Sequence, residues 1–185
     1  MQEQERDVAA LRANQMEVLA ALSRLARRTT SFQDFLESVV TDVRTVFDVE
    51  YCKVLELLPD DKELLLRAGA GWLPGLVGIE TVETDWHSQA GYTLLKKRPV
   101  IVEDLNRERR FNGPALLHLH RVVSGLSVVI HGLERPYGVL GVHSTRLVPF
   151  DETDGKFASV VAEIISGTAE RFGAGGMGRH SEAVG

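Results

Sequence analysis

The sequence predicts an α+β fold in which a central, largely antiparallel sheet carries helices on one face and a coiled-coil-like helix precedes it. Apolar residues recur at helical spacing at both ends of the chain. Between these ends lie short apolar segments separated by turn residues, which is typical of strands. Strands and helices do not alternate regularly, so a doubly wound parallel sheet is disfavoured.

Composition narrows the class of protein further. The 185 residues suffice for one domain with a substantial core and a helical extension. The net charge is −5 and the basic residues are dispersed, so nothing indicates a nucleic-acid partner. No apolar run reaches the roughly 18 residues of a membrane span, and the first residues are charged and polar rather than signal-like. We therefore expect a cytoplasmic protein with neither a membrane nor a nucleic-acid partner.

The first helix is expected over residues 4–28, a stretch without Gly or Pro. Its seam follows the 3–4 spacing of a coiled coil and consists of Val8, Leu11, Gln15, Val18, Leu22 and Leu25. We interpret residues 1–28 as a dimerisation and signalling helix, in which the polar Gln15 would fix the pairing. The alternative is a helix that packs on its own domain.

The remaining elements follow in order along residues 29–172. Ser and Thr hydroxyls at 29–31 can cap a helix whose apolar stripe runs from Phe32 to Phe47. Strands are expected at 50–58 and 64–72, and a loop follows to residue 90. The remaining expected elements are helix 91–97, strand 99–105, polar loop 106–114, short helix 115–120, and a hairpin of two strands before the last helix.

The final hairpin and helix carry two further signals. Gly138 and Gly141 interrupt an apolar strand, which indicates a close approach by another backbone or by a ligand. Asp151 or Thr153 can cap the last helix. Val161 and Ile165 lie on its apolar stripe, and we assign them to the dimer contact as well. Residues 173–185 are rich in Gly and are expected to form a flexible tail or linker.

Five segments of the chain form one recognisable pattern: "VEYCKVLEL", "SQAGYTLLKKRPVIVEDL", "VVSGLSVVIHG", "RPYGVLGVHS" and "PFDETDGKFASVVAEIIS". Together they resemble a GAF domain of the bacterial signal-transduction type. The resemblance covers about residues 32–172 and implies a GAF/PAS-like sandwich, as in sensor histidine kinases of two-component systems and cyclic-di-nucleotide signalling proteins. It also implies a homodimer that binds a small molecule over the sheet and controls an output domain or partner signalling protein.

A ligand site is expected around the middle loop, where aromatic residues with polar tips gather. The candidate ligand-binding residues are Trp72, Trp86, His87, Tyr92, Phe111 and His118. Phe111 would belong to a lid. His118 and His120 are two apart on a short helix, so at most one of them faces inward. In the alternative interpretation, Trp72 and Trp86 merely fill the open face of the sheet. The ligand, any cofactor and any metal stay unassigned.

No motif predicts an enzyme. Cys52 is the single cysteine, so the methionine sulfoxide reductase branch that the resemblance raises lacks its resolving thiol. Haem held by a histidine and cyclic nucleotides stay minor alternatives; Phe150 and Asp154 fit part of a nucleotide signature, but Gly155 stands where that signature has Glu. The main rival to a sensor is a ligand-free structural dimerisation module.

Overall fold

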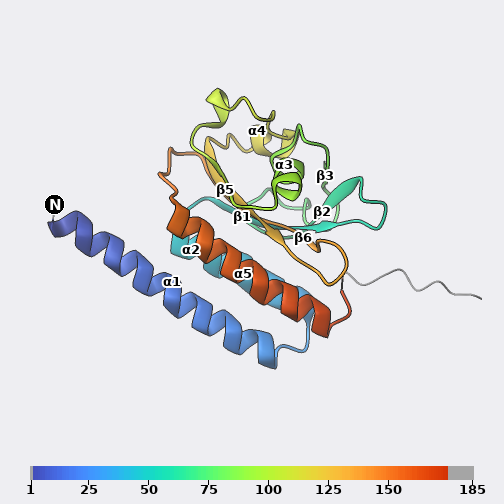
Figure 1. Ribbon diagram of the computed structural model, residues 1–185, viewed down its shortest axis with the longest axis horizontal. Helices are drawn as coiled ribbons and strands as arrows, with labels where there is room; N and C mark the ends of the chain where they lie inside the picture. Colours follow the sequence, from blue (N-terminus) through green and yellow to red (C-terminus); the bar gives the residue numbers. More distant parts are fainter. Residues whose placement is uncertain (1, 175–185) are drawn as a thin grey trace, which may run out of the picture.

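The computed structural model describes residues 2–174 and has the predicted α+β fold (Figure 1). One six-stranded sheet has the order β3-β2-β1-β6-β5-β4, and every neighbouring pair is antiparallel. The strands are β1 (Tyr51–Leu57), β2 (Glu63–Ala70), β3 (Thr81–Glu83), β4 (Val100–Val102), β5 (Ser124–Ile130) and β6 (Gly138–Ser144). The helices are α1 (Gln2–Arg28), α2 (Phe32–Phe47), α3 (Gln89–Lys96), α4 (Ala115–Leu119) and α5 (Glu152–Arg171), with a short 3₁₀ turn at Leu105–Arg107.

The helices divide between the two faces of the sheet. Helices α2 and α5 pack against one face, and α1 lies along their outer side (Figure 1). The short α3 and α4, predicted at 91–97 and 115–120, lie over the opposite face. Strand β3 pairs with β2 at the sheet edge, in a segment that the sequence predicted to be loop. The sequence did not reveal this strand because three residues are too few to display an alternation of apolar and polar residues.

The face covered by α2 and α5 is apolar and tightly packed. Helix α2 begins at Ser31, whose hydroxyl accepts the Asp34 N–H, and ends at Asp48 in the left-handed region. Its predicted stripe is the core: Phe35, Leu36, Val39, Val40 and Val43 are fully covered. Within this core, the rings of Phe47, Phe150 and Phe157 meet edge to face.

Helix α1 folds back onto its own chain after the break at 29–31. Leu22 is fully buried, and Val18 and Leu25 pack against the same core. The Arg12 guanidinium lies 2.7 Å from Asp151 and 2.5 Å from Asp154, at the start of α5. At the other end, Arg171 donates to the carbonyl oxygens of Ala26 and Thr29. Salt bridges and hydrogen bonds therefore hold α1 to both ends of α5.

This packing corrects the assignment of several residues to a dimer contact. Gln15 and Leu22 of α1, and Val161 and Ile165 of α5, are buried within the chain, so a second chain cannot reach them while α1 keeps this position. Gln15 instead donates a hydrogen bond of 3.2 Å to Asp154. The physical reason is that an apolar seam can be buried against a second copy or against its own domain, and here α2 and α5 cover it. Dimerisation itself stays a prediction.

The predicted tail and the hydropathy of the helices complete the description of the fold. The predicted tail 173–185 lies outside the described residues, except for Gly173 and Ala174. None of the helices within residues 2–174 combines the length and the apolar character that crossing a membrane requires.

Candidate functional site

Helix α3 is fixed to the sheet by a buried polar network. The Ser88 hydroxyl caps it by accepting the Gly91 N–H. The Gln89 amide donates to the Ser127 hydroxyl of β5 at 3.0 Å, and Thr93 lies 2.7 Å from the same hydroxyl. These buried groups are therefore paired with one another, and they hold α3 in one position above β5.

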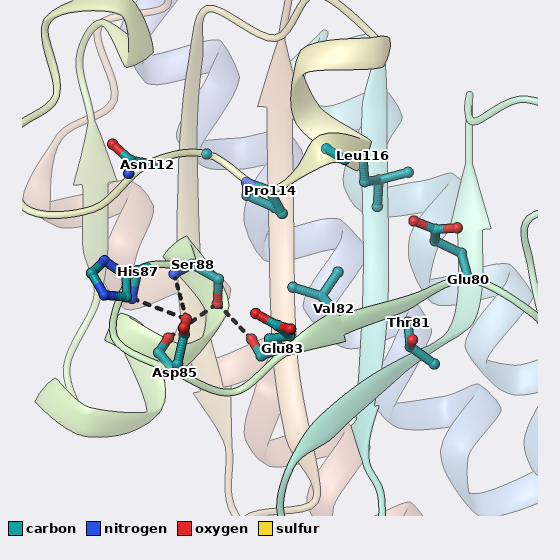
Figure 2. Close-up of a pocket in the computed structure, with 12 residues that line it drawn as sticks. Glu80, Thr81, Val82, Glu83, Asp85, His87, Ser88, Asn112, Pro114 and Leu116 are labelled. Carbon is teal, nitrogen blue, oxygen red and sulfur yellow. Dashed lines mark hydrogen bonds between the residues drawn. The ribbon is translucent and has the colours of Figure 1, made fainter.

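A cavity of about 330 Å³ opens beside α3, between the edge strand β3 and the segment that leads into α4 (Figure 2). Its floor is apolar and includes Val82 and Leu116. His87 and Ser88 lie at one end of the cavity and Glu80 at the other. Such a cleft of mixed lining is of the size that takes a small ligand.

The rim of the cavity is acidic. Glu80, Glu83 and Asp85 line it, and His87 is the single residue among its lining side chains that can carry a positive charge. Asp85 accepts the backbone N–H groups of His87 and Ser88, at 3.1 and 3.3 Å, and so shapes this end. A rim of this charge favours ligands that carry a cation or hydrogen-bond donors.

A second polar centre lies buried in the middle of the same sheet face. Lys53 of β1 pairs across the ladder with Gly141 of β6, and His143 follows two residues along β6 on the same face. Lys53 is 3% exposed and His143 is 1% exposed. No partner for either nitrogen of the His143 ring is found among the described residues, which is rare for a buried polar group.

Burial sets the charge state of both side chains. It lowers the pKa of Lys53 to about 7, because the surroundings disfavour an ammonium; the negative charge of Glu80 offsets only part of that effect. Burial also lowers the pKa of His143 well below its ordinary value, and the charge of Lys53 lowers it further. His143 is therefore neutral at physiological pH, and one of its two nitrogens is a free donor.

Trp72 forms the roof of this centre. Its indole N–H donates to the Cys52 carbonyl at 2.8 Å, and its ring stacks on Tyr51 with centroids 4.7 Å apart. The Lys53 ammonium lies 5.2 Å from the Trp72 ring centroid, within range of a cation–π contact. The predicted ligand residue Trp72 thus covers the buried polar centre.

His120 anchors the loop that carries Trp72. Its Nε2 accepts the Leu73 N–H at 3.1 Å, and its Nδ1 lies 2.8 Å from the Leu116 carbonyl oxygen, to which it donates. His118 is exposed. The sequence prediction named His118 as the ligand residue, whereas α4 ends at Leu119 and it is His120 that the chain turns inward.

The other predicted ligand residues lie in two separate places. His87 lines the cavity, and the centroid of its ring lies 3.7 Å from that of Trp86, which is 57% exposed. The ring centroids of Tyr92 and Phe111 are 5.2 Å apart, and the Arg110 guanidinium lies over both rings. Sequence reasoning missed Lys53 and His143, although a charged residue within the apolar strand "CKVLEL" was a signal for the first.

Cys52 faces away from both polar sites. It is fully buried in the core on the α2 and α5 side, and burial raises the pKa of its thiol. A buried thiol of this kind is unreactive. Within residues 2–174, no group of three or more His, Cys, Asp or Glu side chains is arranged to hold a metal ion.

One family model matches this chain, and several solved structures share its fold. The family model described as "GAF domain" matches residues 31–168. The GAF domain of a phosphoenolpyruvate-protein phosphotransferase from Acinetobacter superposes with a TM-score of 0.74 at 22% identity, over 86% of this chain and 96% of that one. The corresponding domain from Coxiella burnetii gives 0.77 at 16% identity, over 88% and 98%.

Free methionine-R-sulfoxide reductase from Neisseria meningitidis, solved in complex with its substrate, is also similar. Its TM-score is 0.72 at 21% identity, over 84% of this chain and 88% of that one. At such identities these structures show the fold alone. Comparison with curated proteins gave no match.

Proposed function

Because this chain belongs to the GAF domain family, whose members are sensory and regulatory modules of signalling proteins, we propose that it senses a small molecule in the cavity beside β3 and α4. The observation that carries this proposal is the cavity itself, with an apolar floor and an acidic rim. Its ligand would place an amine or another donor group against Glu83 and Asp85, and an apolar part on Val82 and Leu116.

The path from the cavity to the long helices is short. The cavity residue Ser88 caps α3, and α3 packs on β5 and β6. Strand β6 continues through residues 145–150 into Asp151, whose carboxylate binds Arg12 of α1. A ligand that prefers one position of α3 would therefore shift the contact between α1 and α5.

The regulatory output in this proposal is a homodimer acting on an output domain or partner signalling protein in the cytoplasm. Exposed apolar side chains of α1, such as Val8 and Met16, offer contacts to a second copy. The fold needs no disulfide, as suits a reducing compartment. We propose no catalytic step, since the only thiol is buried on the opposite face of the sheet from the cavity.

Native mass spectrometry of the protein as purified from cells tests this function. We expect a dimer that carries a discrete additional mass, and we expect Glu83→Gln with His87→Ala to lose that mass. Glu134→Gln, an exposed carboxylate outside the cavity, is the matched control and should retain it. A monomer would contradict the dimer relay.

The ligand-free structural module is the second candidate, and one observation favours it. Trp72, Tyr51 and His120 fill the centre of the sheet face with their own rings. A dimer that carries no extra mass, and whose melting temperature does not change with cell extract, haem or cyclic nucleotides, would establish this candidate and reject the sensor.

A further inference from the structure

The buried polar centre beneath Trp72 is separate from the cavity, and its two side chains, Lys53 and His143, lack within residues 2–174 the polar partners that buried groups normally have. The interactions of Lys53 are the Trp72 ring and the more distant charge of Glu80, and no ion pair is found for it within the described chain. Both nitrogens of the neighbouring His143 are unpartnered. A methionine in place of Lys53 would fill a similar volume without the cost of burying an amine. A costly buried cation of this kind indicates function rather than packing.

The two side chains converge on one point above β6. A Cβ on Gly141 would lie 2.9 Å from His143 Nε2 and 3.4 Å from Lys53 Cε. A Cβ on Gly125, the partner of His143 in β5, would lie 2.6 Å from His143 Nδ1. Because neither glycine has a side chain, the imidazole lies across the floor above both of them, and the end of the Lys53 side chain lies beside it above Gly141.

From this convergence we propose that Lys53 and His143, above Gly141 and beneath Trp72, bind the carboxylate of a small organic acid. The ammonium and one imidazole N–H supply two donors for the two carboxylate oxygens. One negative charge balances the one charge of Lys53, whereas a phosphate dianion would leave an excess charge buried. The ligand enters when Trp72 moves aside. This movement breaks the hydrogen bond to Cys52 and the Leu73–His120 contact that hold the loop of Trp72.

Trp72 gives a direct optical readout of this event. The chain has two tryptophans, so Trp86→Phe leaves Trp72 as the sole indole reporter. In that background we expect a saturable change in emission with acetate, propionate or pyruvate. The matched amides, acetamide and propionamide, should give none, nor should sodium chloride at equal ionic strength.

Variants locate the site. Lys53→Met removes one partner of a buried charged hydrogen bond and should weaken carboxylate binding by about 100-fold or more. His143→Phe retains the ring and removes the donor, which should weaken it by about 10-fold. Lys62→Met, at an exposed lysine in the β1–β2 turn, is the control and should bind as the parent does. Circular dichroism and thermal melting of Lys53→Met confirm that it is folded.

Four results would overturn the proposal: no saturable response to any carboxylate, an equal response to the amides, tighter binding of phosphate, or unchanged affinity in Lys53→Met. The cavity variant Glu83→Gln with His87→Ala should retain carboxylate binding. If that variant loses the cell-derived ligand while Lys53→Met loses carboxylate, both sites stand; each can fail without the other.

Discussion

The two faces of the sheet differ although they come from the same strands. Alternate residues of β1, β5 and β6 point to opposite sides. On the α2 and α5 side their central residues are apolar, as with Val54, Val128 and Val142, and the polar Glu56, Ser124 and Ser144 lie at the strand ends. On the α3 and α4 side, Lys53, Ser127 and His143 stand among residues such as Leu55 and Val139.

The helices that cover the two faces also differ, in their length. Helices α2 and α5 have 16 and 20 residues, whereas α3 and α4 have 8 and 5. A long helix contributes more buried apolar area, and thereby more stability, than a short one. The comparison indicates that one face supplies stability and the other retains polar groups and loops that can respond to a ligand.

The largest expected effect tests the apolar face. Leu36→Ala removes a fully buried side chain between α2 and the sheet and should lower the free energy of unfolding by about 3 kcal/mol. Urea denaturation followed by circular dichroism measures it. Leu95→Ala, at an exposed leucine of α3, is the control and should change little. Equal losses in both variants would remove the distinction between the faces.

A gain in stability is expected from the opposite face. Lys53→Met removes a buried, uncompensated amine and should raise the free energy of unfolding at pH 6 by about 2 kcal/mol. A loss of stability would mean that Lys53 has a structural partner. The same urea titration, compared with the parent at one pH, gives the answer.

The pH profile sharpens this result. Since the pKa of Lys53 is lowered to about 7 in the folded state, the unfolded chain binds more protons above that pH. The stability of the parent should therefore rise from pH 7 to 9, on the order of 1 kcal/mol per pH unit. His143 stays neutral across this window, and Cys52 and Tyr137, whose pKa values are raised, oppose the rise only near or above its upper limit. Lys53→Met should lack the rise.

A smaller effect is expected at the α1–α5 contact. Asp154→Ala removes the acceptor for Arg12 and Gln15 and half of the capping box of α5, and should cost about 1–2 kcal/mol. Hydrogen exchange should accelerate in α1 more than in α2. Glu152→Gln, at a fully exposed position of the same turn, is the control. Uniform acceleration over all helices would show that α1 does not move independently.

The smallest effect is expected at Trp86. Its side chain is mostly exposed and contacts the His87 ring, so Trp86→Phe should change the free energy of unfolding by less than about 0.5 kcal/mol. Thermal and urea unfolding beside the parent measure the change. A larger loss would show that this loop contributes to the stability of the α3 and α4 face.

The fold class and the order of the main elements follow from local patterns in the sequence. The helical spacing from Phe35 to Val43 and the apolar segment 50–58 are local patterns, and each specifies an element and its buried side without reference to the rest of the chain. Gly138 is a further case: the sequence indicated a close approach, and a Cβ there would collide with the Leu55 carbonyl of β1.

Which surfaces meet depends on contacts that form only in the folded chain. The α1 seam fits a second chain or its own domain, and the turn at 29–31 places it on α2 and α5. The inward position of His120 rather than His118 depends on where α4 ends. Lys53 and His143, 90 residues apart, converge because the antiparallel register sets Lys53 opposite Gly141. Register and helix docking arise from contacts between distant segments, and no local pattern encodes those contacts.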